Sequence, residues 1–281
     1  GLGLFILVLS LADWPQIDHL PRLRWLPLAG AAGVTFIITG SITLRWGLIV
    51  RQLGGRQVAT WMRLYYYFVA SRALGFILPK DLADFGFRMG GLKRQHNYGL
   101  AYGGLSVAMD RLFDALFMLI SLVAVLPYWF RLLDIPATLA LFAGLQLALL
   151  LGFIIAHRQF FRALSRLANW LRLFLLRLPY FRQKLQTPIV IPDFSRALTL
   201  KLYALSLLKL LATISRFVLF AMSFGLSIVP WALILGTPLA QLSYLLAFTP
   251  GGIGIFEAGW LGVLKLAAIP ATEAGLFIAA Q

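Results

Sequence analysis

Phe76-Ile-Leu-Pro-Lys-Asp-Leu-Ala-Asp84 and Phe248-Thr-Pro-Gly-Gly-Ile-Gly-Ile-Phe-Glu257 are two apolar stretches interrupted by proline, glycine and acidic residues. In lipid, a backbone N–H or C=O group without a partner is costly. Interrupted helices therefore persist at membrane depth only where they line a protected polar cavity. Two such interruptions in one chain predict broken or re-entrant helical hairpins beside a polar site.

The composition places the chain among membrane proteins. Hydrophobic residues make up 60% of the sequence and charged residues only 12%, and the mean hydropathy is +0.85. The net charge of +15 would suggest nucleic acid as a partner for a soluble protein. Here the basic residues flank apolar runs, as the positive-inside rule and anionic headgroups require. We therefore expect membrane lipids and their anionic phospholipid headgroups as partners, and no nucleic acid.

The residues that most often bind metals or form disulfides are scarce. The chain has no cysteine, which excludes disulfides and thiolate metal sites. The three histidines, His19, His96 and His157, are too scattered to form a ligand cluster. We expect no cofactor and no metal.

The apolar runs predict an all-α, polytopic membrane protein with about six to eight membrane segments, counted at 1.5 Å of rise per residue. Partial spans at both ends, Gly1–Ala12 and Ala271–Gln281, indicate a single domain over residues 1–281 that is truncated at each terminus. The full runs are Trp25–Trp46, Val58–Leu78, Tyr98–Leu126, Thr138–Ala156, Ala197–Leu226, Trp231–Phe248 and Ile255–Ala268.

The basic connections constrain the topology. They are the segment around Arg45, Arg51 and Arg56, the segment from Arg88 to Arg94, and residues 157–196. The positive-inside rule predicts that all three face the cytoplasm. They can do so if residues 58–92 form a re-entrant hairpin that turns at Pro79. If residues 58–78 are instead an ordinary span, the rule is violated once.

The same reasoning applies to the C-terminal part. Residues 127–137 would form a short external loop, and residues 231–268 would dip in from outside and turn at Pro250–Gly254. Two hairpins of opposite orientation would make an inverted repeat, as in many transporters.

Carboxylates and small residues share one face of the run Tyr98–Leu126. At 100° per residue the members of this face are Gly99, Gly103, Ser106, Asp110, Asp114 and Ser121. Carboxylates cannot face acyl chains without a large cost, so they must point at protein or water. They either tie helices together by pairing with arginines or line a functional cavity.

Bases outnumber acids at membrane depth. If these charges converge, they leave a net positive cavity that suits a phosphate or phosphodiester, which arginine binds in a bidentate manner. Basic side chains near span ends, such as Arg63 and Lys201, can instead reach the interface. The candidate substrate-binding residues are Arg72, Asp84, Arg88, Asp110, Arg111, Asp114, Lys209, Arg216, Pro250, Gly251, Gly252, Gly254 and Glu257.

Residues 158–178 have the pattern of an amphipathic helix. Phe160, Leu164, Leu167, Leu171, Phe174 and Leu178 form one stripe, and five arginines lie on the opposite arc. The pattern predicts a helix in the cytoplasmic interface that anionic headgroups attract.

Several elements together resemble a known family. They are Arg45-Trp46, a tyrosine-rich helix, Leu78-Pro79 with Arg88 after it, Asp110-Arg111-x-x-Asp114, and Pro250-Gly-Gly-Ile-Gly-Ile-Phe-Glu257. This order resembles the lysylphosphatidylglycerol synthase transmembrane region, also described as the flippase-like domain family. The resemblance implies movement of a polar or aminoacylated lipid between the leaflets of a cytoplasmic membrane.

Three functions follow from these patterns. The first is translocation of a phosphate-containing lipid, without chemistry, across the cytoplasmic (inner) membrane. The second is a membrane-embedded transferase for lipid or polyprenyl-phosphate substrates, although neither Asp81 with Asp84 nor Asp110 with Asp114 has a histidine at ligand or base spacing. The third is a scaffold that recruits a lipid-modifying enzyme. We expect no catalytic residue.

Overall fold

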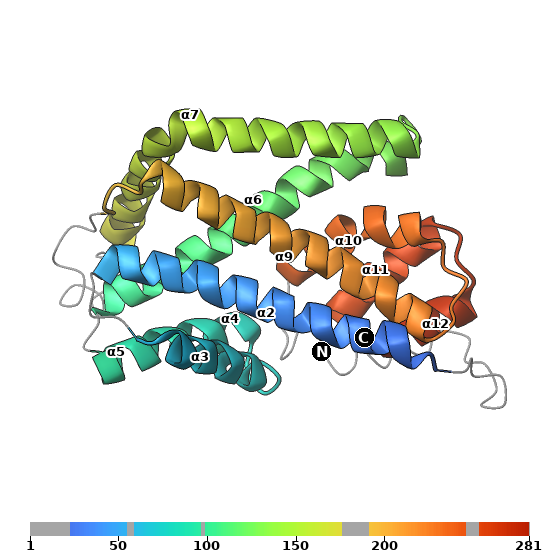
Figure 1. Ribbon diagram of the computed structural model, residues 1–281, viewed down its shortest axis with the longest axis horizontal. Helices are drawn as coiled ribbons and strands as arrows, with labels where there is room; N and C mark the ends of the chain where they lie inside the picture. The colour runs from blue at the N-terminus through green and yellow to red at the C-terminus, as the bar shows by residue number, and fades with distance from the viewer. Residues whose placement is uncertain (1–22, 55–58, 97–98, 176–190, 246–252, 281) are drawn as a thin grey trace.

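The computed structural model describes residues 23–54, 59–96, 99–175, 191–245 and 253–280. Within these ranges all regular structure is helical, which confirms the predicted all-α class. The elements are α2 (Trp25–Gly54), α3 (Trp61–Leu74), α4 (Lys80–Asp84), η2 (Phe85–Met89), α5 (Gly90–His96), α6 (Leu100–Trp129), α7 (Ile135–Leu175), α9 (Arg196–Ser223), α10 (Pro230–Leu245), α11 (Ile255–Leu266) and α12 (Ala271–Ala280) (Figure 1).

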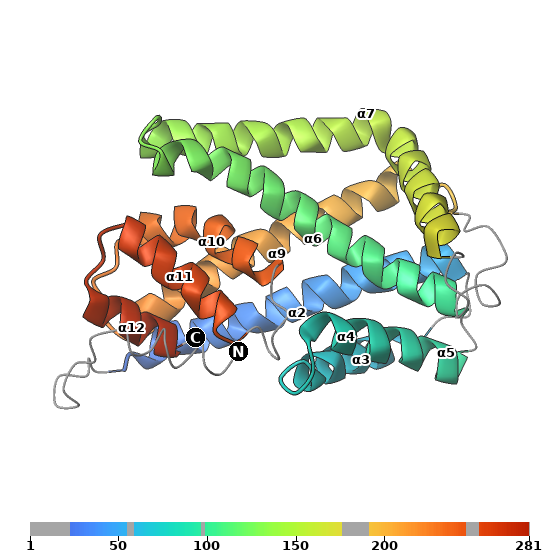
Figure 2. The same cartoon turned by 180° about the vertical axis from the view of Figure 1, so that it is seen from behind.

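Four helices of the described residues, α2, α6, α7 and α9, are long and apolar enough to cross a membrane. They correspond to four of the apolar runs in the sequence, and the helices α2 and α9 lie side by side over much of their length (Figures 1 and 2). The predicted polytopic architecture is confirmed. The total number of membrane segments stays a prediction.

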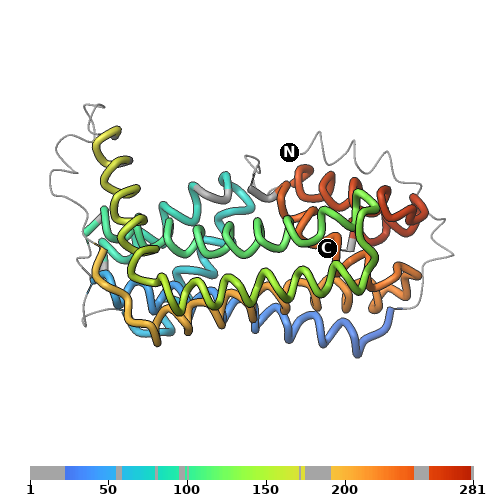
Figure 3. The backbone as a smooth tube through the Cα atoms, turned by 90° about the horizontal axis from the view of Figure 1, so that it is seen from above, coloured from blue at the N-terminus to red at the C-terminus, as the bar shows by residue number. Residues whose placement is uncertain are grey.

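Helix α7 bends at Ala156, whose backbone angles of φ −110° and ψ 16° are not helical. The part after the bend turns away from the rest of the bundle (Figure 3). The bend coincides with the predicted boundary between the span Thr138–Ala156 and the basic segment 157–196. The connection before α7 is shorter than the predicted loop 127–137, because α6 continues to Trp129 and α7 begins at Ile135.

Residues 61–96 form a helical hairpin, called the first hairpin below. Its first leg is α3, and its second leg comprises α4, η2 and α5, with α4 and η2 packed on α3. At about 1.5 Å per residue α3 is ~21 Å long, too short to cross a hydrocarbon layer of ~30 Å. The legs are joined at Gly75–Pro79, where Phe76 and Ile77 are 72% and 74% exposed. A turn at Pro79 was predicted, and its apolar exposed tip suits contact with lipid.

Residues 230–266 form the second hairpin, in which α10 packs on α11. Its predicted turn includes Pro250, Gly251 and Gly252, which lie outside the described residues. Gly254, which precedes α11, has φ 87°, in the left-handed region that favours glycine. The two hairpins occupy opposite ends of the long axis, with the first beside the end of α2 and the second beside the end of α9 (Figures 1 and 2). The predicted inverted repeat is a proposal that this placement supports.

Two buried cores follow from this arrangement. One includes Trp46, Leu64, Tyr67, Phe113 and Phe161, and joins α2, the first hairpin, α6, α7 and α9. The other includes Phe217, Trp260 and Phe277, and joins α9 to α11 and α12. Charged side chains are buried beside the first core.

Candidate functional site

Asp110 of α6 lies at the centre of a buried set of ion pairs. Its Oδ1 accepts a hydrogen bond from Arg45 Nε at 2.8 Å, and its Oδ2 accepts one from Arg88 Nη2 at 2.9 Å. All three side chains are at most 1% exposed. Isolated charges are strongly disfavoured at such depth, so each of these groups requires the others.

Arg45 joins three long helices. In addition to the Asp110 carboxylate, it donates to the backbone carbonyl of Asp110 at 3.0 Å. It also donates to Ser206 Oγ of α9 at 2.9 Å and to Asp114 Oδ1 at 2.6 Å. Because one guanidinium provides donors in several directions, Arg45 of α2 fixes α6 and α9 relative to each other.

Asp84 connects the first hairpin to α6. It forms an ion pair with Arg111, and its Oδ1 accepts a hydrogen bond from Ser71 Oγ at 2.7 Å. Arg88 Nη1 lies 3.8 Å from Asp84 Oδ2. Asp84 is therefore one of the points at which the hairpin is held to α6, together with the Arg88–Asp110 pair.

Arg88 is fully buried in the single π-helical turn of the described residues, η2. Its guanidinium lies 4.2 Å from the centroid of the Trp46 ring and 5.6 Å from that of Phe68. The guanidinium carbon of Arg72 also lies over the Phe68 ring, 4.9 Å from its centroid. Among the described residues, Arg88 Nε and Nη1 have no hydrogen-bond acceptor. The aromatic rings thus pack against a cation that has unused hydrogen-bond donors. π-Helical turns are frequent at functional sites.

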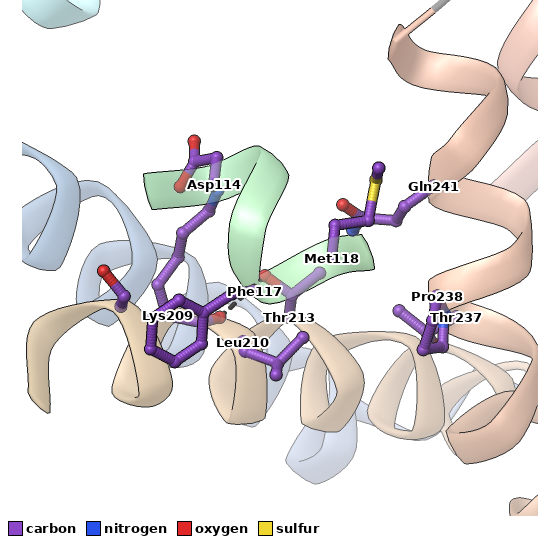
Figure 4. A pocket seen from close by; sticks show the side chains of 10 residues that line it. Asp114, Phe117, Met118, Lys209, Leu210, Thr213, Thr237, Pro238 and Gln241 are labelled. Atoms are coloured by element: carbon purple, nitrogen blue, oxygen red, sulfur yellow. Dashed lines mark hydrogen bonds and ion pairs between the residues drawn. The ribbon is translucent and has the colours of Figure 1, made fainter. Parts of the chain in front are cut away.

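Lys209 and Asp114 form the partly exposed edge of this set, with Nζ and Oδ1 2.7 Å apart and side-chain exposures of 21% and 18%. Both residues lie near the middle of their helices, which span residues 100–129 and 196–223. They line a pocket of about 30 Å³ between α6, α9 and α10, called the central pocket below (Figure 4). Its other walls include Thr213, Thr237 and Gln241.

The charges in this region do not cancel. We define the charge network as Arg45, Arg88, Arg111 and Lys209 with Asp84, Asp110 and Asp114. Four bases and three acids leave one positive charge, before Arg72 beside Phe68 is counted. The sequence predicted a net positive cavity, and six members of the network were among its candidates.

The other described candidates contact different groups. Glu257 accepts a hydrogen bond from the N–H of Gly254 at 2.7 Å, so its carboxylate caps the N-terminus of α11. Arg216 lies over the ring of Phe217, with 5.0 Å between the guanidinium carbon and the ring centroid. Gly254 is the turn residue described above. Their membership of a binding site stays a prediction.

The location predicted for Arg45 from the sequence was wrong. It was assigned to a basic cytoplasmic connection, but it is 1% exposed and lies inside α2, which continues to Gly54. A base near the end of an apolar run has the same pattern whether it reaches water or pairs with an acid. The motif Arg45-Trp46 was the available signal, since Trp46 Nε1 donates to Ser106 Oγ at 3.1 Å on the acidic face of α6.

The comparison with protein families gives one match. The model of the family described as "Lysylphosphatidylglycerol synthase TM region" matches residues 1–280. No curated protein and no solved structure matches the chain.

Proposed function

This chain belongs to the family of the lysylphosphatidylglycerol synthase TM region, and on that premise we propose that it translocates a phosphate-containing lipid across the cytoplasmic membrane. The headgroup would be polar, aminoacylated or glycosylated. The observation that carries the proposal is the Lys209–Asp114 pair, which lines a pocket near the middle of two membrane-length helices.

Lys209 is the group that would receive the phosphate. Its side chain is 21% exposed, and its ammonium is paired with Asp114 Oδ1. A phosphodiester that reaches the pocket offers Lys209 a second anionic partner, and charge-assisted bonds of this kind are strong. The net positive charge of the network favours an anion over a cation at this point.

Asp114 would then bind the rest of the headgroup. When Lys209 turns to a phosphate, Asp114 still accepts from Arg45 and can accept from an amine or a sugar hydroxyl. Gln241 adds an amide to the same wall. This division of roles suits a headgroup that carries both a phosphate and a donor group.

The central pocket must widen during transport. A volume of about 30 Å³ accommodates water but not a phosphate headgroup. The two hairpins lie at opposite ends of the long helices, so movement of each could open one side in turn. The acyl tails would remain in lipid, along the exposed apolar faces of the long helices.

A transport assay in proteoliposomes tests the proposal. Lys209→Met removes the pocket charge and keeps the length of the side chain, whereas Lys201→Met removes an exposed charge from the same helix. With a fluorescent phosphatidylglycerol in both leaflets, an added quencher that cannot cross the membrane reaches the inner-leaflet lipid only after translocation. The quenching of that lipid should be at least fivefold slower for Lys209→Met than for the unchanged chain, and Lys201→Met should match the unchanged chain. Equal rates for both variants and for protein-free vesicles would reject translocation of this lipid.

A further inference from the structure

A second polar site lies at the basic end of the bundle, where the bend of α7 meets the start of α9. Two adjoining cavities of about 520 and 380 Å³ share His157, Arg158 and Arg196 as wall residues. We call them together the bend pocket. It is formed by the end of the bundle opposite the second hairpin and shares no lining residue with the central pocket.

The charge of the bend pocket is positive. Arg158, Arg162 and Arg196 contribute three guanidinium groups to its walls, and all three side chains are exposed. Asp193 is the one acid that lines it. Three bases and one acid leave two positive charges, which match a phosphate group.

The N-terminus of α9 adds to this charge. Ser195 is the N-cap of this 28-residue helix, and its hydroxyl accepts a hydrogen bond from the N–H of Leu198 at 3.2 Å. The N–H groups of the first helical turn have no intrahelical acceptor, and they lie at the positive end of the helix dipole. Helix N-termini of this kind bind anions.

His157 supplies the independent indication that a ligand belongs here. Its side chain is only 8% exposed, it lines both cavities, and its Nδ1 has no hydrogen-bond partner among the described residues. A buried polar atom without a partner is uncommon in folded proteins and requires an explanation. Nδ1 itself has almost no accessible surface, so a bound phosphate oxygen would accept a hydrogen bond from it once the ring turns toward the cavity.

We propose that the bend pocket is a phosphate-binding site, in which Arg158, Arg162 and Arg196, the start of α9 and His157 surround the bound group. The phosphate would come from a phospholipid headgroup or from free phosphate. The lipid source is favoured by Ile155, a wall residue that is 78% exposed on the membrane-length part of α7. This site does not depend on translocation through the central pocket.

Native mass spectrometry of the purified full chain with a short-chain phosphatidylglycerol tests the site. Arg158→Gln with Arg196→Gln removes two pocket charges, one from α7 and one from α9. The matched control, Arg166→Gln with Lys201→Gln, removes two exposed charges from the same helices outside the pocket. We expect the pocket pair to weaken retention of one bound lipid at least fivefold and the control to change it less than twofold. His157→Phe, which retains a ring without a polar nitrogen, should weaken it about threefold.

A parallel titration with inorganic phosphate separates the two sources. Displacement of the lipid only at phosphate concentrations at least 100-fold above that of the lipid identifies the headgroup as the ligand. Binding of inorganic phosphate alone, lost in the pocket pair and kept in the control, identifies free phosphate. If the pocket pair and the control behave alike with both probes, the bend pocket is not a phosphate site. Because the lipid assay needs no transport, its failure would leave the proteoliposome result unaffected.

Discussion

The two hairpins share apolar contacts with the long helices but differ in what is added to those contacts. The first hairpin is also attached through charges, with Asp84 bound to Arg111 and Arg88 bound to Asp110. The second is attached through aromatic packing, with ring centroids of Phe217 and Trp260 4.8 Å apart. Ion pairs in a buried site have few alternative geometries, whereas apolar surfaces can slide. The comparison indicates that the first hairpin has a fixed position on the long helices, whereas the second can adjust its position.

The largest expected effect is at Asp110. Asp110→Ala leaves Arg45 and Arg88 buried without their shared carboxylate. The free energy of unfolding should fall by about 3–5 kcal/mol, measured by denaturant unfolding in mixed micelles. Asp193→Ala, which removes an exposed carboxylate, should change it by less than ~0.5 kcal/mol. A similar small loss for both would show that the ion pairs do not hold the first hairpin.

In the apolar region the corresponding test is Trp260→Leu. Trp260 is fully buried, so the smaller side chain leaves a cavity between α11, α9 and α12. The expected loss in the same assay is about 2–3 kcal/mol, less than that for complete truncation. Trp170→Leu changes a side chain that is 62% exposed and serves as the control. If Trp260→Leu is as mild as its control, packing does not hold the second hairpin.

A glycine allows close approach both beside the first hairpin, at Gly47 of α2, and within the second, at Gly236 of α10. A Cβ at Gly47 would clash with the ring of Trp61 in the first hairpin, and a Cβ at Gly236 would clash with Val263 in the second. Each alanine substitution should cost about 1–3 kcal/mol by overpacking. Gly33→Ala meets nothing within 4 Å and should not destabilise. A Cβ at Gly47 would meet both Trp61 and Leu64 within 3.0 Å, whereas one at Gly236 would meet only Val263 that closely. We therefore expect Gly236→Ala to cost less than Gly47→Ala, and the reverse order would contradict this reasoning.

The smallest expected effect is at two serines. Ser71 Oγ bonds both the carbonyl of Phe68 and the carboxylate of Asp84, whereas Ser243 Oγ bonds the carbonyl of Ala240. Ser71→Ala should cost about 1–2 kcal/mol because it removes a bond to a charged group. Ser243→Ala should cost less than ~0.5 kcal/mol, since the carbonyl it leaves is already part of a helix. Equal values from unfolding in micelles would remove the distinction between charged and neutral attachment.

The parts of the fold that depend on local pattern could be predicted from the sequence. The four long helices follow from long apolar runs of neighbouring residues. The predicted end of one run at Ala156 coincides with the bend of α7. The acidic face of α6 was also predicted, because helical periodicity is a local property.

The parts that depend on distant partners could not be predicted. Arg45 is buried because Asp110, 65 residues further along the chain, supplies the carboxylate that pairs with it. Glu257 was assigned to the site, yet its carboxylate bonds the Gly254 amide three residues earlier. The spacing Gly254-x-x-Glu257 is a capping-box pattern, so this contact was a local signal that the charge count concealed.

The central claim is that the central pocket, between α6, α9 and α10, opens to water and ions during transport. The chain has no cysteine, so a single introduced thiol reports one position. Thr213→Cys faces the pocket, and Leu211→Cys, two residues away on the same helix, replaces a side chain that is 47% exposed outside it. In lipid vesicles, a charged methanethiosulfonate should react with the cysteine at 213 at least ten times faster than with the cysteine at 211. A slower or equal rate at 213 would contradict a polar pathway between α6, α9 and α10.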